Sequence, residues 1–157
     1  MALMISIRNA EMHEIPLLEA LQLRASVVAP DYREALAAHP EVIHLPDADV
    51  REGRTRVTVV EDQIVGFSVV LPVHDVSQEL DGLFVEPGRM GQGVGRALID
   101  DVVTRARSLG VHRIDVIANP TAVGFYTKVG FTRGNDAETQ FGPAFWMHRD
   151  VHPSHDE

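Results

Sequence analysis

The sequence contains no cysteine. Disulfides, thiolate nucleophiles and cysteine-ligated zinc are therefore excluded, and any chemistry has to come from oxygen and nitrogen groups. No stretch approaches the ~20 apolar residues of a membrane span. The apolar residues 1–7 are too few for the core of a signal peptide and meet Arg8 at once. These absences predict a cytoplasmic protein with no membrane partner.

Basic residues are also scarce, since 14 Lys and Arg face 23 Asp and Glu, which gives a net charge of -9. Nucleic acid is therefore a disfavoured partner, because Lys and Arg contacts to phosphate dominate its binding. A cationic small substrate is compatible, although acidity also simply keeps a protein soluble. The 157 residues, 45% hydrophobic and 24% charged, fit one globular domain, and we expect residues 1–157 to form it.

The spacing of apolar residues alternates between helical and strand patterns along the chain. Pro40 and Pro46 interrupt residues 41–53, where no element can be read. The patterns predict a mixed α/β sheet with helices on both faces. The expected strands are residues 3–8, 55–60, 64–71, 78–85, 113–118, 145–149 and a run from 131 onward, and the expected helices are residues 15–28, 31–38, 95–108 and 121–128.

A glycine-rich turn joins the strand at 78–85 to the following helix, with the sequence Glu86-Pro87-Gly88-Arg89-Met90-Gly91-Gln92-Gly93-Val94-Gly95-Arg96. Unpaired backbone N–H groups gather at the start of a helix, and glycine lets the backbone approach an anion closely. Arg96 stands where a Rossmann fingerprint needs its last glycine, and no Walker motif occurs. The turn therefore predicts a pyrophosphate site, the alternative being a tight connection without a ligand.

Residues 80–131 resemble the core of the GNAT superfamily of acetyltransferases. The matching residues are Leu83-Phe84-Val85-x-Pro87, Gly93-x-Gly95-Arg96-Ala97-Leu98, Asn119, Ala122, Phe125-Tyr126-x-Lys128 and Gly130-Phe131. The resemblance implies an α/β (α+β) fold, with a mixed, mostly antiparallel twisted sheet and helices on both faces. One position departs from the family pattern: Met90 replaces a polar residue, and Arg89 lies one position too early.

The resemblance also implies an activity, that of an acyltransferase of the N-acetyltransferase class. Acetyl-CoA is the expected cosubstrate, with no metal, and a primary amine of a small-molecule acceptor would attack it directly in a ternary complex. Backbone N–H groups of residues 83–85 would then meet the thioester carbonyl. The residues implied in coenzyme binding are Leu83, Phe84, Val85, Arg89, Gly91, Gln92, Gly93, Val94, Gly95, Arg96, Asn119 and Tyr126.

Three side chains are candidates for the catalytic groups. By resemblance, Tyr126 would assist the leaving thiolate, as a proton donor or as a hydrogen-bond donor, although a core aromatic residue fits the same pattern. Glu79 and Asp81, two residues apart, share one face of the strand before the thioester site. Either could act as the base or hold the amine, or could simply face solvent; His74 is a further candidate for the base.

Two other functions remain open from the sequence. A non-catalytic GNAT-fold sensor of acyl-CoA is compatible with Met90, but it has no need of a thiolate partner such as Tyr126. A peptide-binding module would show no affinity for the coenzyme. The acceptor and dimerisation are also left open.

Overall fold

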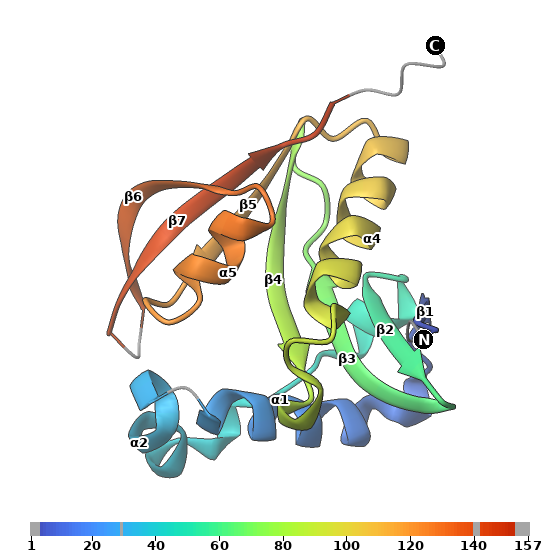
Figure 1. Ribbon diagram of the computed structural model, residues 1–157, viewed down its shortest axis with the longest axis vertical. Helices are drawn as coiled ribbons and strands as arrows, with labels where there is room; N and C mark the ends of the chain where they lie inside the picture. The colour runs from blue at the N-terminus through green and yellow to red at the C-terminus, as the bar shows by residue number, and fades with distance from the viewer. Residues whose placement is uncertain (1–3, 29, 140–141, 153–157) are drawn as a thin grey trace. The chain divides into compact units, whose positions relative to one another are not determined.

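The computed structural model describes residues 4–28, 30–139 and 142–152 (Figure 1). Its strands form a seven-stranded sheet with the order β1-β2-β3-β4-β5-β7-β6. The β4–β5 pair is parallel, whereas β1–β2, β2–β3, β5–β7 and β6–β7 are antiparallel, so the predicted mixed, mostly antiparallel sheet is confirmed. The strands are β1 Ser6–Asn9, β2 Thr55–Val60, β3 Gln63–Val70, β4 Ser77–Val85, β5 Arg113–Ala118, β6 Thr132–Thr139 and β7 Gly142–Asp150.

The predicted helices form within two residues of their expected bounds, and one more occurs where the sequence could not be read. The helices are α1 Ile15–Val28, α2 Pro30–Ala38, α3 Asp47–Arg51, α4 Val94–Ser108 and α5 Val123–Lys128, and the 3-10 turns are η1 Met12–Glu14, η2 Pro40–Val42 and η3 Pro87–Arg89. Over the described ranges, every helix is too short or too polar to span a lipid bilayer.

The chain forms two compact units, which are described separately. The first comprises Met1–Val69 and Gly82–Leu98, and the second comprises Val70–Asp81 and Ile99–Glu157. That residues 1–157 form one domain stays a prediction.

The first unit has a hydrophobic cluster on each face of its sheet. On one face, Leu18 and Leu21 of α1 are fully buried and lie in one cluster with Val57 and Phe67. In the second cluster, the start of α4 packs with β2 and β3; its buried members are Val60, Val65, Val94 and Leu98. Helices therefore cover both faces of this part of the sheet, as predicted.

Gly66 of β3 lies at the closest approach between the sheet and the start of α4. A Cβ atom there would lie 3.0 Å from the Phe84 carbonyl oxygen, 3.0 Å from Val94 Cγ1 and 3.3 Å from Leu98 Cδ1. Real Cβ atoms are rarely this close to a backbone oxygen, so a side chain at this position would push α4 away from β3. The glycine thus allows the first turns of α4 to pack closely against β3.

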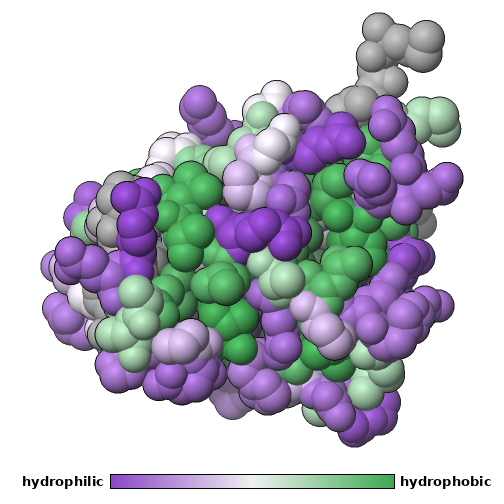
Figure 2. Space-filling model, turned by 90° about the horizontal axis from the view of Figure 1, so that it is seen from below, coloured by the Kyte–Doolittle hydropathy of each residue, from purple (hydrophilic) through white to green (hydrophobic). Residues whose placement is uncertain are grey.

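The outer side of α1 is less polar than its sequence pattern suggests. The helical spacing of Ile15, Leu18, Leu21, Ala25 and Val28 predicts one buried stripe, but Val28 is 50% exposed, and Leu17 and Leu23 are exposed as well. Figure 2, seen from below Figure 1, shows hydrophobic patches among hydrophilic residues. The inward face of α1 consists of Ile15, Leu18, Leu21 and Ala25.

In the second unit, the two faces of β5 differ sharply. Ile114, Val116 and Ala118 are buried, whereas the alternate residues Arg113, Asp115 and Ile117 are exposed or half-buried. Met147 of β7 pairs with Val116 and is buried too, so one face of this sheet belongs to the core. The other face is open, and it carries the charged side chains considered below.

Candidate active site

The glycine-rich turn begins with η3 and ends at the first turn of α4. Gly91 and Gly93 have φ angles of 81° and 85°, in the left-handed region that a side chain disfavours. A Cβ atom on either would meet nothing within 4 Å, so backbone conformation rather than crowding explains these two glycines.

The backbone N–H groups of residues 91–96 are available to a ligand. The first N–H bond into α4 runs from Ala97 to the Gly93 carbonyl oxygen at 3.0 Å, and in the described part of the chain no hydrogen bond is recorded from the N–H groups of residues 91–96. Residues 91–93 are exposed. Because α4 has no acidic residue in its first turn, its positive N-terminal dipole is not offset.

The side chains of this turn divide into one buried anchor and several exposed groups. Val94 is 1% exposed and packs into the first unit's core, whereas Met90 is 63% exposed. Arg96 and Gln92 are exposed, and Arg89 is half-buried. The position that departs from the family pattern therefore offers no polar group, and Arg96 and Arg89 are the turn's cationic side chains.

An ion pair fixes the start of the turn to α1. Arg24 donates from Nε and Nη2 to the two carboxylate oxygens of Glu86, at 2.9 and 2.7 Å. The hydrogen bond from Arg24 lowers the pKa of Glu86, against a smaller opposing effect of burial. The Glu86 N–H also donates to the Val65 carbonyl oxygen at 2.8 Å. Hydrogen bonds thus hold both the side chain and the backbone of Glu86, directly before the glycine-rich segment.

The end of β4 extends beyond its pairing with β5. The β4–β5 register runs from Ser77–Arg113 to Leu80–Val116, so Leu83, Phe84 and Val85 lie past its last pair. Leu83 and Val85 pack against the cluster at the start of α4, and Phe84 packs against Phe67 with ring centroids 5.1 Å apart. These contacts fix the backbone of residues 83–85, whose N–H groups are the predicted oxyanion donors.

In the second unit, Glu79 lies on the open face of β4 and stands opposite Asp115 in the β4–β5 register. Burial, and then the charges of Asp81 and Asp115, raise the pKa of the Glu79 carboxyl. No cationic partner of Glu79 is recorded among the described residues. Its carboxyl group is therefore better suited than an ordinary glutamate to take up a proton near neutral pH.

Tyr126 and Asn119 both have structural roles that the sequence left open. Tyr126 is 7% exposed, and its ring makes edge contacts with Phe125 and Phe131 at centroid distances of 5.2 and 5.3 Å. Asn119 Oδ1 accepts a hydrogen bond from the Ala122 N–H at 2.9 Å and so supports the turn before α5. Neither role excludes a ligand contact through the Tyr126 phenol or the Asn119 amide N–H₂.

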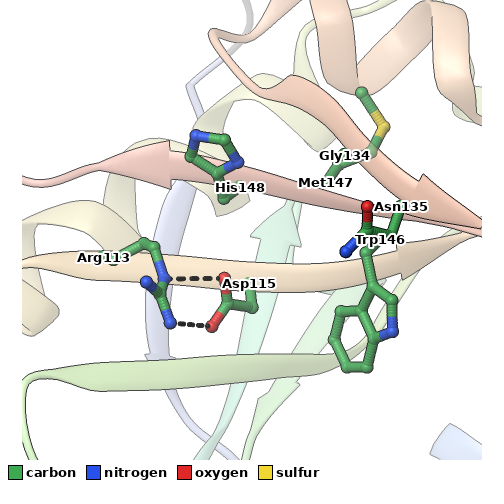
Figure 3. Close-up of a pocket in the computed structure, with 7 residues that line it drawn as sticks. All are labelled: Arg113, Asp115, Gly134, Asn135, Trp146, Met147 and His148. Carbon is green, nitrogen blue, oxygen red and sulfur yellow. Dashed lines mark hydrogen bonds and ion pairs between the residues drawn. The ribbon is translucent and has the colours of Figure 1, made fainter.

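A pocket of about 330 Å³ opens on the same unit (Figure 3). It is lined by Arg113, Asp115, Gly134, Asn135, Trp146, Met147 and His148. Arg113 and Asp115 form an ion pair with an Nε–Oδ1 distance of 2.9 Å. The sequence did not single out Asp115 or Trp146, because only strand pairing places Asp115 opposite Glu79 and Trp146 opposite Ile117. His74 lies elsewhere, in an exposed turn where its backbone bridges Ser77.

One group of described side chains has the proximity of a metal site, but it already has another role. Ligand atoms of Glu11, His13 and Glu14 lie within 4.8 Å of one another. Glu14 accepts from Arg8 at 3.0 and 2.8 Å and from the Glu11 N–H at 2.8 Å, as part of the capping box of η1. Its carboxylate oxygens are thus occupied by hydrogen bonds.

Comparison with known proteins places this architecture in a family. An acetyltransferase (GNAT) domain model matches residues 28–145. The peptidyl-lysine N-acetyltransferase YjaB of Escherichia coli K12 is 34% identical over 130 residues, which cover 82% of this chain and 83% of that protein. The chain therefore belongs to the GNAT acetyltransferase family, and the predicted class of enzyme, an N-acetyltransferase, is confirmed with it.

Solved structures agree in fold. A GCN5-related N-acetyltransferase from Rhodopseudomonas palustris matches with a TM-score of 0.77 at 22% identity, over 96% of this chain and 99% of its own. The PaiA N-acetyltransferase of Thermoplasma acidophilum, solved with coenzyme A, matches with a TM-score of 0.75 at 14% identity, over 94% and 99%. At these identities the likeness shows the fold alone.

Proposed function

We propose that this protein is a cytoplasmic, acetyl-CoA-dependent N-acetyltransferase that transfers the acetyl group to a primary amine of a small-molecule acceptor. The observation that carries the proposal is the set of backbone N–H groups at residues 91–96, which have no recorded acceptor in the described structure and stand at the start of a 15-residue helix. Such a site binds the pyrophosphate of the coenzyme. Arg96 adds a positive charge to it.

In this proposal the acetyl group is activated by backbone rather than by side chains. The N–H groups of residues 83–85 stabilise the negative charge that develops on the thioester oxygen. Packed contacts hold Leu83, Phe84 and Val85 in place, so these donors need little rearrangement during the reaction. The amine attacks the thioester directly in a ternary complex, and the absence of cysteine is consistent with a transfer that forms no acetyl-cysteine intermediate.

Proton transfer needs a base, because a primary alkylamine with a pKa of ~10.4 is neutral in only about one molecule in a thousand at pH 7. Glu79 is our first candidate, directly or through water, since its pKa is raised and its carboxyl lies on the open sheet face. Asp81 is the second candidate. Tyr126 is assigned to the leaving thiolate, which its phenol would stabilise by a hydrogen bond or protonate.

A CoA-release assay over a panel of amines tests the proposal. We expect CoA release that depends on the presence of a small primary amine and is absent with matched alcohols. The relative YjaB is a peptidyl-lysine N-acetyltransferase, and the lysine side chain carries a primary amine of the same kind. Coenzyme binding without release by any amine would identify a sensor instead, and release with a lysine peptide but no small amine would overturn the small-molecule acceptor.

A further inference from the structure

The open sheet face of the second unit carries two neighbouring rows of side chains. The acidic row consists of Glu79 and Asp115 and continues to His148, and the apolar row consists of Ile117 and Trp146. In the strand registers, Glu79 of β4 stands opposite Asp115 of β5, and Asp115 stands opposite His148 of β7. Two residues further along, Ile117 stands opposite Trp146. Since alternate residues of a strand share a face, these five side chains project from one surface.

The pocket described above lies over this surface. Asp115 and His148 of the acidic row and Trp146 of the apolar row all line it, together with Asn135 of β6. Figure 3 shows the Asn135 amide beside the Trp146 indole and the Arg113–Asp115 ion pair on the neighbouring strand. The pocket thus offers an aromatic wall and a carboxylate within one small volume.

The charge of this face favours a cation. Arg113 is paired with Asp115, and no cationic partner of Glu79 is recorded among the described residues. Burial raises the pKa of Glu79 most, and the nearby negative charges of Asp81 and Asp115 raise it further. Because Arg113, which also lines the pocket, neutralises the charge of Asp115, the excess negative charge of this face comes from Glu79, and it favours an ammonium group over a carboxylate.

We propose that this face selects the acceptor, and that the acceptor is a small primary amine on an apolar or aromatic stem with no carboxylate beside the amine. The ammonium lies at the row of Glu79 and Asp115, and the stem lies on Ile117 and Trp146. Strand spacings of about 4.8 Å and about 6.8 Å per two residues put the rows roughly 7 to 12 Å apart, the reach of such a stem. The inference rests on the proposed function only in naming this amine as the acceptor.

Trp146 provides a direct test, because it is the one tryptophan of the chain. Its fluorescence reports ligands in the pocket without turnover, and CoA can be added because it carries no acetyl group. We expect phenethylamine to give a saturable change, and phenylalanine, with the same stem and an added carboxylate, to bind at least about tenfold more weakly. Phenylalaninamide, which lacks the carboxylate charge, should recover most of the affinity.

Ile117→Lys should reverse the selection. Ile117 is 37% exposed, and a lysine there would repel the amine and attract a carboxylate, so the preference for phenethylamine over phenylalanine should fall about tenfold. Leu109→Lys is the matched control, since Leu109 is 59% exposed after α4 and outside both rows; it should keep the wild-type preference.

Three outcomes would overturn the assignment: equal affinity for phenethylamine and phenylalanine, no fluorescence response to phenethylamine, or an unchanged preference in a folded Ile117→Lys. The comparison of ligands on the wild-type protein decides the question even if that variant does not fold. Calorimetry with CoA on the same samples separates the two proposals, because absent CoA binding would contradict the transferase function and leave the amine titration to stand on its own.

Discussion

At the scale of single residues, the position of Tyr126 combines packing with chemistry. Its ring lies between Phe125 and Phe131, so removing only the phenol oxygen keeps these contacts. We predict that Tyr126→Phe lowers kcat by about 10- to 10³-fold, because the thiolate loses its hydrogen bond or proton donor, with little change in CoA affinity. Steady-state acetylation and melting temperature are measured on the same samples. An early-melting variant with wild-type kcat would show that the residue serves the core alone.

Ionisation of Glu79 should determine the acid limb of the pH–rate profile, where activity falls at low pH. Because burial and the neighbouring charges of Asp81 and Asp115 raise its pKa, its ionised form is lost at a higher pH than for an ordinary glutamate at ~4.3. We predict that kcat/KM falls as the pH drops through this raised pKa, and that Glu79→Gln lowers kcat/KM and removes this limb. The pH–rate profile of the variant is the measurement.

The same shift has an opposite consequence for stability. The folded protein holds the Glu79 proton more tightly than the unfolded chain does, so this group's contribution to the free energy of unfolding falls as the pH rises from the unfolded to the folded pKa. Asp81→Asn tests the second candidate base; if Glu79 is the base, this variant removes one of the charges that raise the Glu79 pKa and should move the acid limb to lower pH without removing it. Wild-type rates in both amide variants across the pH range would place the base elsewhere, with water or His74 next.

At the scale of elements, the packing of β3 against α4 connects the core to the glycine turn. Gly66→Ala would place a Cβ about 3.0 Å from Val94 Cγ1 and from the Phe84 carbonyl oxygen. We predict a loss of about 1–3 kcal/mol in the free energy of unfolding and weaker CoA binding, because α4 must shift. Gly124→Ala in α5, where a Cβ meets nothing within 4 Å, should be neutral or stabilising. Denaturant unfolding measures the stability of both variants, and titration measures their CoA affinity. Equal stability of the two variants would contradict the close packing of α4 on Gly66.

Elements whose signal is local were predictable from the sequence. The spacing of Val94, Leu98, Val102, Ala106 and Leu109 indicated α4; the first four residues are buried, whereas Leu109, just past the end of the helix, is 59% exposed. The polar residues after Val60 indicated a hairpin, and the structure has Glu61 and Asp62 in the turn with positive φ angles. By contrast, α3 lies directly after Pro46, in a stretch of five helical residues too short to show a period.

The parts that the sequence could not supply depend on strand order. β5 pairs with β4 and with β7, which lie far from it and from each other along the chain. No periodicity reveals that Asp115 stands opposite Glu79 or that Trp146 stands opposite Ile117. His148, which no motif of the sequence marks as functional, lines the pocket for the same reason.

At the scale of the whole molecule, the net charge of -9 should act in opposite directions on the two substrates. It attracts a cationic amine and repels anionic acetyl-CoA, and salt screens both effects, since the Debye length falls from about 30 Å at ~0.01 M to about 10 Å at ~0.1 M. We predict that kcat/KM falls with added salt for the amine and stays level or rises for acetyl-CoA. An amine whose kcat/KM rises with salt would contradict a cationic acceptor.

The proposed function depends on coenzyme binding at the N–H groups of residues 91–96, and calorimetric titration with CoA measures this binding. Gly93 has a φ of 85°, so Gly93→Val forces a β-branched residue into the left-handed region and should weaken binding at least about tenfold. Gly88→Ala is the control in the same turn, since its Cβ meets nothing within 4 Å and its φ is not positive. We expect binding by the wild type and by Gly88→Ala, and its loss in a folded Gly93→Val. No binding by folded wild type, or equal affinity in Gly93→Val, would contradict it.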